Sequence, residues 1–265
     1  MSIPKFGMLT NPSLEILKEI ETIYELDFDY VEIGIETPEG EPAILNKKKF
    51  KIMKLLKSFN TKPIGHTAPW IDLGSSYESV RRGWILESKK FIKVAKKLGL
   101  TLLNFHANTN GMFFGRNRKI ILDNWVRSLR EIVPYAKDMN VELMLENMPR
   151  GRAIHTLDEV EYITKYVPEL QIHLDIPHAF SSGGIKSVQN YIRTFRERIA
   201  HIHWHDNHGV FDEHLPIGAG LIDHRRVVKA LKEINYERTI TLEIFTSKND
   251  AKTSAEQLKD LWKTV

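Results

Sequence analysis

Val-Glu-Leu-Met-Leu-Glu-Asn, residues 141–147, is a short apolar run that ends in a carboxylate and an amide. Its length and composition predict a buried strand, and an amphipathic stretch near Leu157–Tyr166 follows it as a predicted helix. A second apolar run, Leu170–Ile176, comes next and again carries a carboxylate near its end, at Asp175. This order of strand, helix and strand is typical of a parallel sheet with crossover helices.

The same alternation extends over the whole chain. We expect strands over Lys5–Leu9, Tyr30–Ile35, Lys62–Thr67, Thr101–Ala107, Val141–Asn147, Leu170–Ile176, Ile199–Asp206 and Thr239–Phe245. We expect helices from about Ser13, a plausible N-cap, and near Lys47–Lys57, Glu78–Lys97 (ending at Gly99), Lys119–Lys137, Leu157–Tyr166, Ile185–Glu197, His224–Ile234 and Ala255–Trp262. Eight such units that close on themselves predict an α/β fold, a (β/α)8 TIM barrel in one domain spanning residues 1–265. A doubly wound open sheet is less favoured, because no Gly-rich phosphate loop follows the first strand.

Composition limits the chemistry that this barrel can support. The chain has 265 residues and no cysteine, so any bound metal must use nitrogen and oxygen ligands. The N-terminus lacks a signal-peptide pattern and no apolar run reaches the roughly 18 residues of a membrane span, so we expect a cytoplasmic protein without membrane contact. The net charge of +4 suits an anionic partner, but the basic residues are scattered, which favours a Lys/Glu-rich surface. Arg150 and Arg152 could hold an anionic group or be solvated loop arginines.

Polar side chains gather where the predicted strands end. In such barrels the active site lies at the C-terminal ends of the strands. Buried carboxylates repel one another unless they are paired or bind metal, so this set predicts a divalent metal site. A mixed nitrogen and oxygen set suits Zn, Mn, Co or Fe better than Ca. The residues concerned are His66, His106, Glu146, Asp175, His178, His203, Asp212, His214 and Glu243.

Three more histidines lie on or near the sixth and seventh predicted strands. His201 and His205 alternate with His203, so they share its face of the strand, and at most one or two of the three can reach the same metal. A structural role is the simpler reading of His173.

At these residues the chain resembles the xylose isomerase-like barrel superfamily over essentially its whole length. This superfamily includes sugar and sugar-phosphate isomerases and epimerases, inosose dehydratases and abasic-site nucleases of the endonuclease IV type. Together the motifs are specific to the superfamily and much less specific to one activity. The segments that carry the resemblance are His66–Pro69, Leu145–Asn147, Leu174–Phe180, His203–Gly209, Asp212–Gly220 and Leu242-Glu243.

The resemblance implies two possible sites. In the isomerases and epimerases one divalent metal is held by four residues, which match Glu146, Asp175, His203 and Glu243, and the two glutamates move a carbon-bound proton through an enediolate. In the nucleases nine ligands hold three zinc ions for phosphodiester hydrolysis. All nine have counterparts here: His66, His106, Glu146, Asp175, His178, His203, Asp212, His214 and Glu243.

Features near the barrel mouth favour the isomerase. The loop at Glu36–Pro42, with Glu32 before it, is acidic where the nuclease resemblance calls for a basic, DNA-contacting loop. The segments at His205–Gly209 and Asp212–Gly220 also depart from the nuclease pattern, whereas Trp70 could wall a pocket or intercalate in DNA.

We therefore expect a metal-dependent sugar or sugar-phosphate isomerase or epimerase with Glu146 and Glu243 as catalytic residues. The alternative is a zinc-dependent phosphodiesterase acting on abasic DNA. A barrel that binds metal without catalysis is less favoured, because paired carboxylates at a metal are costly to keep without use. We expect one to three ions of Zn, Mn, Co or Mg per chain, and the sequence leaves the oligomeric state open.

Overall fold

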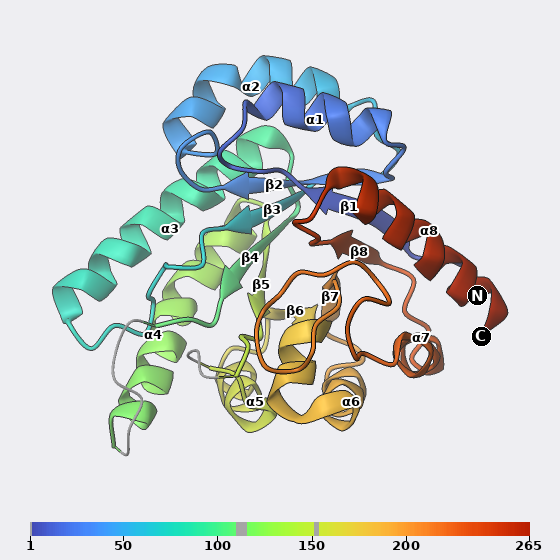
Figure 1. The fold of residues 1–265 in the computed structure, drawn as a ribbon. Coiled ribbons are helices and arrows are strands. Elements are labelled where there is room, and N and C mark those ends of the chain that lie inside the picture. Colours follow the sequence, from blue (N-terminus) through green and yellow to red (C-terminus); the bar gives the residue numbers. More distant parts are fainter. Residues whose placement is uncertain (1, 110–115, 151–153) are drawn as a thin grey trace.

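A computed structural model describes residues 2–109, 116–150 and 154–265, so Arg152 lies outside the described residues. The strands form one closed parallel barrel in chain order, and the helices surround it (Figure 1). The strands are β1 (Lys5–Leu9), β2 (Tyr30–Ile35), β3 (Ile64–Thr67), β4 (Leu102–His106), β5 (Glu142–Glu146), β6 (Gln171–Asp175), β7 (Ile199–Trp204) and β8 (Thr239–Leu242). The helices are α1 (Ile16–Glu25), α2 (Pro42–Leu56), α3 (Glu78–Leu98), α4 (Arg116–Asp138), α5 (Leu157–Tyr166), α6 (Ile176–Thr194), α7 (His224–Glu233) and α8 (Lys248–Thr264).

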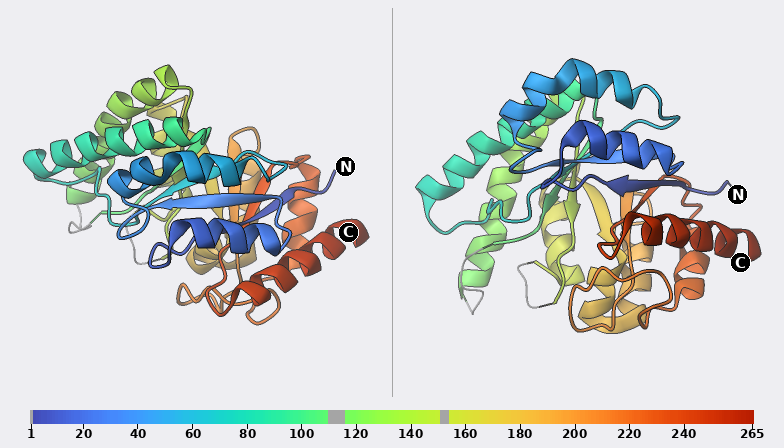
Figure 2. Two further views of the ribbon diagram at one scale, coloured as in Figure 1. Left: turned by 90° about the horizontal axis from the view of Figure 1, so that it is seen from above. Right: turned by 45° about the horizontal axis from the view of Figure 1, so that its top comes forward.

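The predicted (β/α)8 barrel is confirmed, and strand β1 closes the ring by pairing with β8. The turned views in Figure 2 show α1 and α8, from the two ends of the chain, close to each other on one side of the barrel. No helix in the described part of the chain is long and apolar enough to cross a membrane. That residues 1–265 form one domain stays a prediction.

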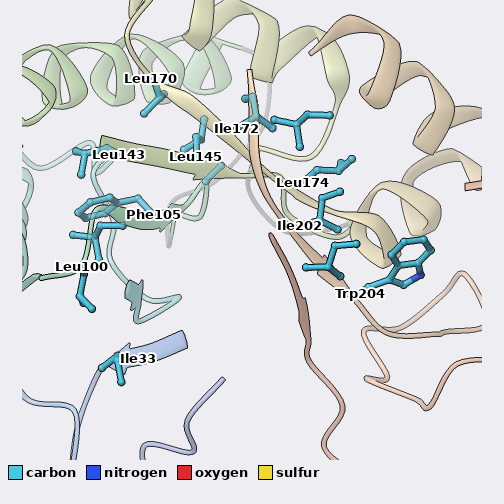
Figure 3. Close-up of a cluster of buried hydrophobic side chains, with 14 of the residues drawn as sticks. Ile33, Leu100, Phe105, Leu143, Leu145, Leu170, Ile172, Leu174, Ile202 and Trp204 are labelled. Atoms are coloured by element: carbon cyan, nitrogen blue, oxygen red, sulfur yellow. The ribbon is translucent and has the colours of Figure 1, made fainter. Parts of the chain in front are cut away.

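Side chains along each strand point alternately toward the helices, where they form the core, and into the barrel, where they form the site. Leu143 and Leu145 belong to the large apolar cluster between strands and helices (Figure 3), whereas Met144 belongs to a small separate cluster. Because neighbouring side chains on a strand point to opposite faces, Glu146 points with Met144 into the barrel. The same rule places the side chain of Ile202 on the outer face of the barrel and the side chain of His203 in its interior.

Several helix starts differ from the sequence expectation. Helix α2 begins at Pro42, where the prediction began near Lys47, and α8 begins at Lys248, where the prediction began near Ala255. The N-cap of α1 is Glu15 and not Ser13, because the Glu15 side chain accepts a hydrogen bond from the Lys18 backbone N–H. Helix α6 begins at Ile176, nine residues before the predicted start. The Asp175 carboxylate caps it by accepting from the His178 N–H at 2.6 Å. Non-helical dihedrals at 183 and 184 interrupt the helix, so the predicted start matches only its second part.

Asp206 anchors the long connection between β7 and α7. Its carboxylate accepts hydrogen bonds from the backbone N–H groups of Gly218 (3.0 Å) and Ile222 (3.2 Å). An isolated antiparallel bridge joins Asp206 to Leu215. These contacts fix the connection on both sides of the segment that carries Asp212.

Replacing Gly220 by Ala is expected to destabilise this connection. A Cβ at position 220 would lie 2.4 Å from both the Asn207 carbonyl oxygen and Oδ1 of Asp206, so the backbone must shift. We expect the free energy of unfolding to fall by about 1–3 kcal/mol, measured by urea unfolding. Gly83→Ala is the matched control. It lies in helix α3 with nothing within 4 Å of a new Cβ, and it should raise stability by about 0.5–1 kcal/mol. Equal stability of Gly220→Ala and the wild type would contradict this account of the connection.

Candidate metal centre

A cavity of about 640 Å³ opens at the C-terminal end of the barrel. Asp175 and His203 do not line it and are fully buried. Seven of the predicted site residues line the cavity: His66, His106, Glu146, His178, Asp212, His214 and Glu243.

One group of potential ligands joins three adjacent strands. Glu146, Asp175 and His203 stand at or near the ends of β5, β6 and β7, and their ligand atoms lie within 4.8 Å of one another. Glu243 follows β8, and its Oε2 lies 3.0 Å from Nδ1 of His203. The structure therefore brings together the four residues predicted to hold a single metal.

A second group shares Glu146 with the first. The ligand atoms of His66, His106 and Glu146 also lie within 4.8 Å of one another. Oε2 of Glu146 is 3.2 Å from Nε2 of His106 and 3.7 Å from Nε2 of His66. Asn104, buried on β4, donates a hydrogen bond to the same oxygen at 2.5 Å and orients the carboxylate.

A third group of potential ligands lies on the β7–α7 connection. It includes His205, which was not among the predicted metal ligands. His205, Asp212 and His214 have ligand atoms within 4.8 Å of one another. Oδ2 of Asp212 also lies 3.1 Å from Nε2 of His178. The alternation of His205 with His203 is the signal that could have identified it.

Glu32 is a further residue of the site that the sequence pattern did not indicate. This residue lies on β2, is fully buried and forms a possible ligand group with His66 and His203. His173, interpreted as structural, is fully buried, and its Nδ1 lies 3.3 Å from Oε2 of Glu146. The clusters therefore continue from the mouth into the barrel interior.

The two predicted catalytic glutamates have opposite pKa shifts. Burial raises the pKa of Glu146 to about 8 and also raises that of Asp175. Burial acts in the same direction on Glu243, but His203 and His214 outweigh it and lower the pKa of Glu243 well below its usual value. In the metal-free protein Glu146 therefore favours the protonated form and Glu243 the ionised form.

The histidines that line the cavity fall into two classes by the direction of their pKa shifts. Burial lowers the pKa of His66 to about 4 and lowers the pKa of His106 well below its usual value, so both rings are neutral. Burial opposes charge on His178 as well, but Asp175 and Asp212 raise its pKa to about 10. Neutral imidazoles are ready nitrogen ligands, whereas a protonated His178 would release its proton on binding metal.

The residues present fit a divalent cation with nitrogen and oxygen ligands. Four buried atoms at the mouth have no hydrogen-bond partner among the described residues: Nε2 of His66, Nδ1 of His106, Oδ2 of Asp175 and Nε2 of His205. Buried polar atoms normally have partners, and a cation close to these atoms would supply one. It would also offset the cost of burying the negative charges of Glu146 and Asp175, which is the cost that raises their pKa values.

The profile of the family described as "Xylose isomerase-like TIM barrel" matches residues 20–263. The chain belongs to this family. Among similar proteins, an uncharacterized protein of Methanocaldococcus jannaschii is 32% identical, over 98% of this chain and 90% of the relative. A crystal structure described as a D-tagatose 3-epimerase-like protein is 30% identical, with a TM-score of 0.87 over 98% of both chains.

A relative named as a nuclease is similar over less of the chain. A probable endonuclease 4 of Thermotoga petrophila is 29% identical over 59% of this chain and 59% of its own length. The similarity to the epimerase-like structure therefore extends further along this xylose isomerase-like barrel.

Proposed function

We propose that this protein is a metal-dependent sugar isomerase or epimerase that moves a carbon-bound proton with Glu146 and Glu243. The observation that carries the proposal is the pair of glutamates itself. Both line one cavity. A ligand atom of Glu146 lies within 4.8 Å of one of His203, and Oε2 of Glu243 lies 3.0 Å from Nδ1 of His203. The full-length similarity to a D-tagatose 3-epimerase-like protein supports the same class of reaction.

The proposed reaction gives each glutamate a separate task. When bound by Glu146, Asp175, His203 and Glu243, the metal supplies polarisation of the sugar's carbonyl and hydroxyl oxygens. The ionised Glu243 removes the proton from the carbon next to the carbonyl, leaving an enediolate. Glu146 returns a proton to the other face of that carbon, and the roles exchange in the reverse reaction.

The walls of the cavity suit a small polyol. Trp70 and Phe245 line it beside the polar groups and present apolar surface to the ring of a sugar. Glu36 follows β2 and also lines the cavity, where its carboxylate can accept hydrogen bonds from sugar hydroxyls. Lys248 lines the cavity in an ion pair with the buried Glu19, so its charge is already neutralised.

A second candidate function has one specific observation in its favour. The nine residues that match the trinuclear zinc ligands of endonuclease IV-like enzymes are all at this end of the barrel, and seven of them, together with His205, form the three potential ligand groups described above. A zinc-dependent phosphodiesterase acting on abasic DNA is therefore the alternative. Glu36 in the cavity disfavours it when ionised, since a carboxylate repels phosphate; burial and the nearby Glu243 raise the pKa of Glu36 to about 7.

Metal content and substrate panels distinguish the two candidates. Protein purified without added chelator or metal is analysed for metal per chain and then incubated with free ketoses, ketose phosphates and an abasic DNA duplex. The proposal expects about one ion per chain and a new sugar epimer or isomer detected by NMR. About three zinc ions together with cleavage of abasic DNA would replace it by the alternative.

A further inference from the structure

A carboxylate lies deep in the barrel below the predicted metal ligands. Glu32, on β2, is fully buried, and its Oε2 lies 2.9 Å from Nε2 of His203 and 3.2 Å from Nε2 of His201. Nδ1 of His201 in turn lies 2.9 Å from Oγ1 of Thr239. A buried carboxylate needs such donors, and here both donors are histidines of β7.

His203 lies between two carboxylates, one at each ring nitrogen. Nε2 faces Glu32, and Nδ1 lies 3.0 Å from Oε2 of Glu243. A neutral imidazole has one N–H and one lone pair, so a hydrogen bond from Nε2 to Glu32 leaves the lone pair on Nδ1. Because Glu243 is itself a proposed ligand, Nδ1 is the nitrogen on the side of the metal.

The ring of His203 is held on a second side as well. The imidazole of His66 stacks on it with centroids 5.2 Å apart and an interplanar angle of 13°. The stack limits tilting of the ring, and the bond to Glu32 limits rotation about its Cβ–Cγ axis. Together these two contacts leave a single ring orientation, with Nδ1 directed at Glu243.

We propose that Glu32 is a positioning residue of the metal centre, holding Nε2–H of His203 so that Nδ1 is presented to the cation. The inference rests on the proposed metal-dependent function and concerns a residue outside the predicted ligand set. Carboxylates that accept from a metal-ligating histidine fix its tautomer and increase its basicity, and their loss typically lowers metal affinity 10- to 100-fold. We expect Glu32 to have an effect of that size.

The first test measures metal affinity of the metal-depleted protein by competition with a chelating indicator, using Zn²⁺. In Glu32→Gln the amide keeps the size of the side chain but loses its charge, and we expect Kd to rise 10- to 100-fold. Glu159→Gln is the matched control, because Glu159 is also buried but caps α5 away from the cavity, so its Kd should equal that of the wild type. Unchanged affinity of Glu32→Gln would overturn the proposal.

The second test needs no variant. In protein with ¹⁵N-labelled histidine and bound ¹¹³Cd²⁺, NMR should show the cadmium coupling at Nδ1 of His203 and a slowly exchanging proton at Nε2. Coupling at Nε2 would overturn the role of Glu32. Both tests are independent of sugar turnover: a protein that binds metal as expected but converts no sugar would contradict the proposed function and leave the role of Glu32 intact.

Discussion

Glu243→Gln is expected to lower kcat for sugar conversion by about 10²–10⁴-fold, the usual contribution of a positioned acid–base group. The amide keeps the size of the side chain and can still contact His203, but it cannot accept a carbon-bound proton. Metal binding should weaken without being lost, because Glu146, Asp175 and His203 remain as a ligand group. The two effects are measured separately, by the rate of epimer formation at saturating metal and by metal titration.

Glu237→Gln is the matched control for this variant. Glu237 precedes β8, at the opposite end of the strand from Glu243, and its carboxylate accepts a hydrogen bond from the Ser2 backbone N–H. We expect its kcat to equal that of the wild type. Normal turnover by Glu243→Gln at saturating metal would show that Glu243 is not the proton-transfer residue.

Removing the metal is expected to lower the melting temperature substantially. Without a cation the carboxylates of Glu146 and Asp175 are buried close together, and their raised pKa values reflect the cost of ionising them there. Metal at about 100 times its Kd would stabilise the folded state by about 2.7 kcal/mol. At roughly 2–4 °C per kcal/mol for a chain of this size, the melting temperature should rise by roughly 5–11 °C.

Calorimetry of chelator-treated and dialysed protein, with and without added Zn²⁺, Mn²⁺ or Co²⁺, measures this shift. Ca²⁺ provides the comparison, since a site rich in imidazole should bind it weakly and give a smaller shift. Identical melting temperatures with and without all of these ions would contradict a metal centre at the barrel mouth.

The barrel could be predicted from sequence because its signals are local. Apolar runs bounded by helical patterns located β1 and β2 with their observed bounds. The start of α6 could not be found in this way, because the Gly183-Gly184 break conceals the continuity of the helix with the residues after β6. Whether a side chain caps a helix, as Asp175 does, depends on geometry that spacing alone does not give.

The site could be predicted only in part. The rule that barrel sites form at the C-terminal ends of strands identified residues that the structure gathers around one cavity, although their roles as ligands stay predictions. Glu32 was considered only as an acidic residue before the Glu36–Pro42 loop, because its contact with His203 joins residues 171 positions apart. The alternation of His205 with His203 placed both residues on one face of the predicted strand, but spacing alone does not show that His205 lies beside Asp212 and His214.

The most direct test of the central claim is deuterium incorporation. The metal-loaded protein is incubated with a ketose in D₂O, and the sugar is analysed by NMR and mass spectrometry. Proton transfer by Glu146 and Glu243 predicts metal-dependent incorporation of one deuterium at the carbon next to the carbonyl, together with formation of the epimer or isomer. A panel of ketoses and ketose phosphates that shows neither deuterium incorporation nor conversion, alongside cleavage of abasic DNA by the same preparation, would contradict the claim.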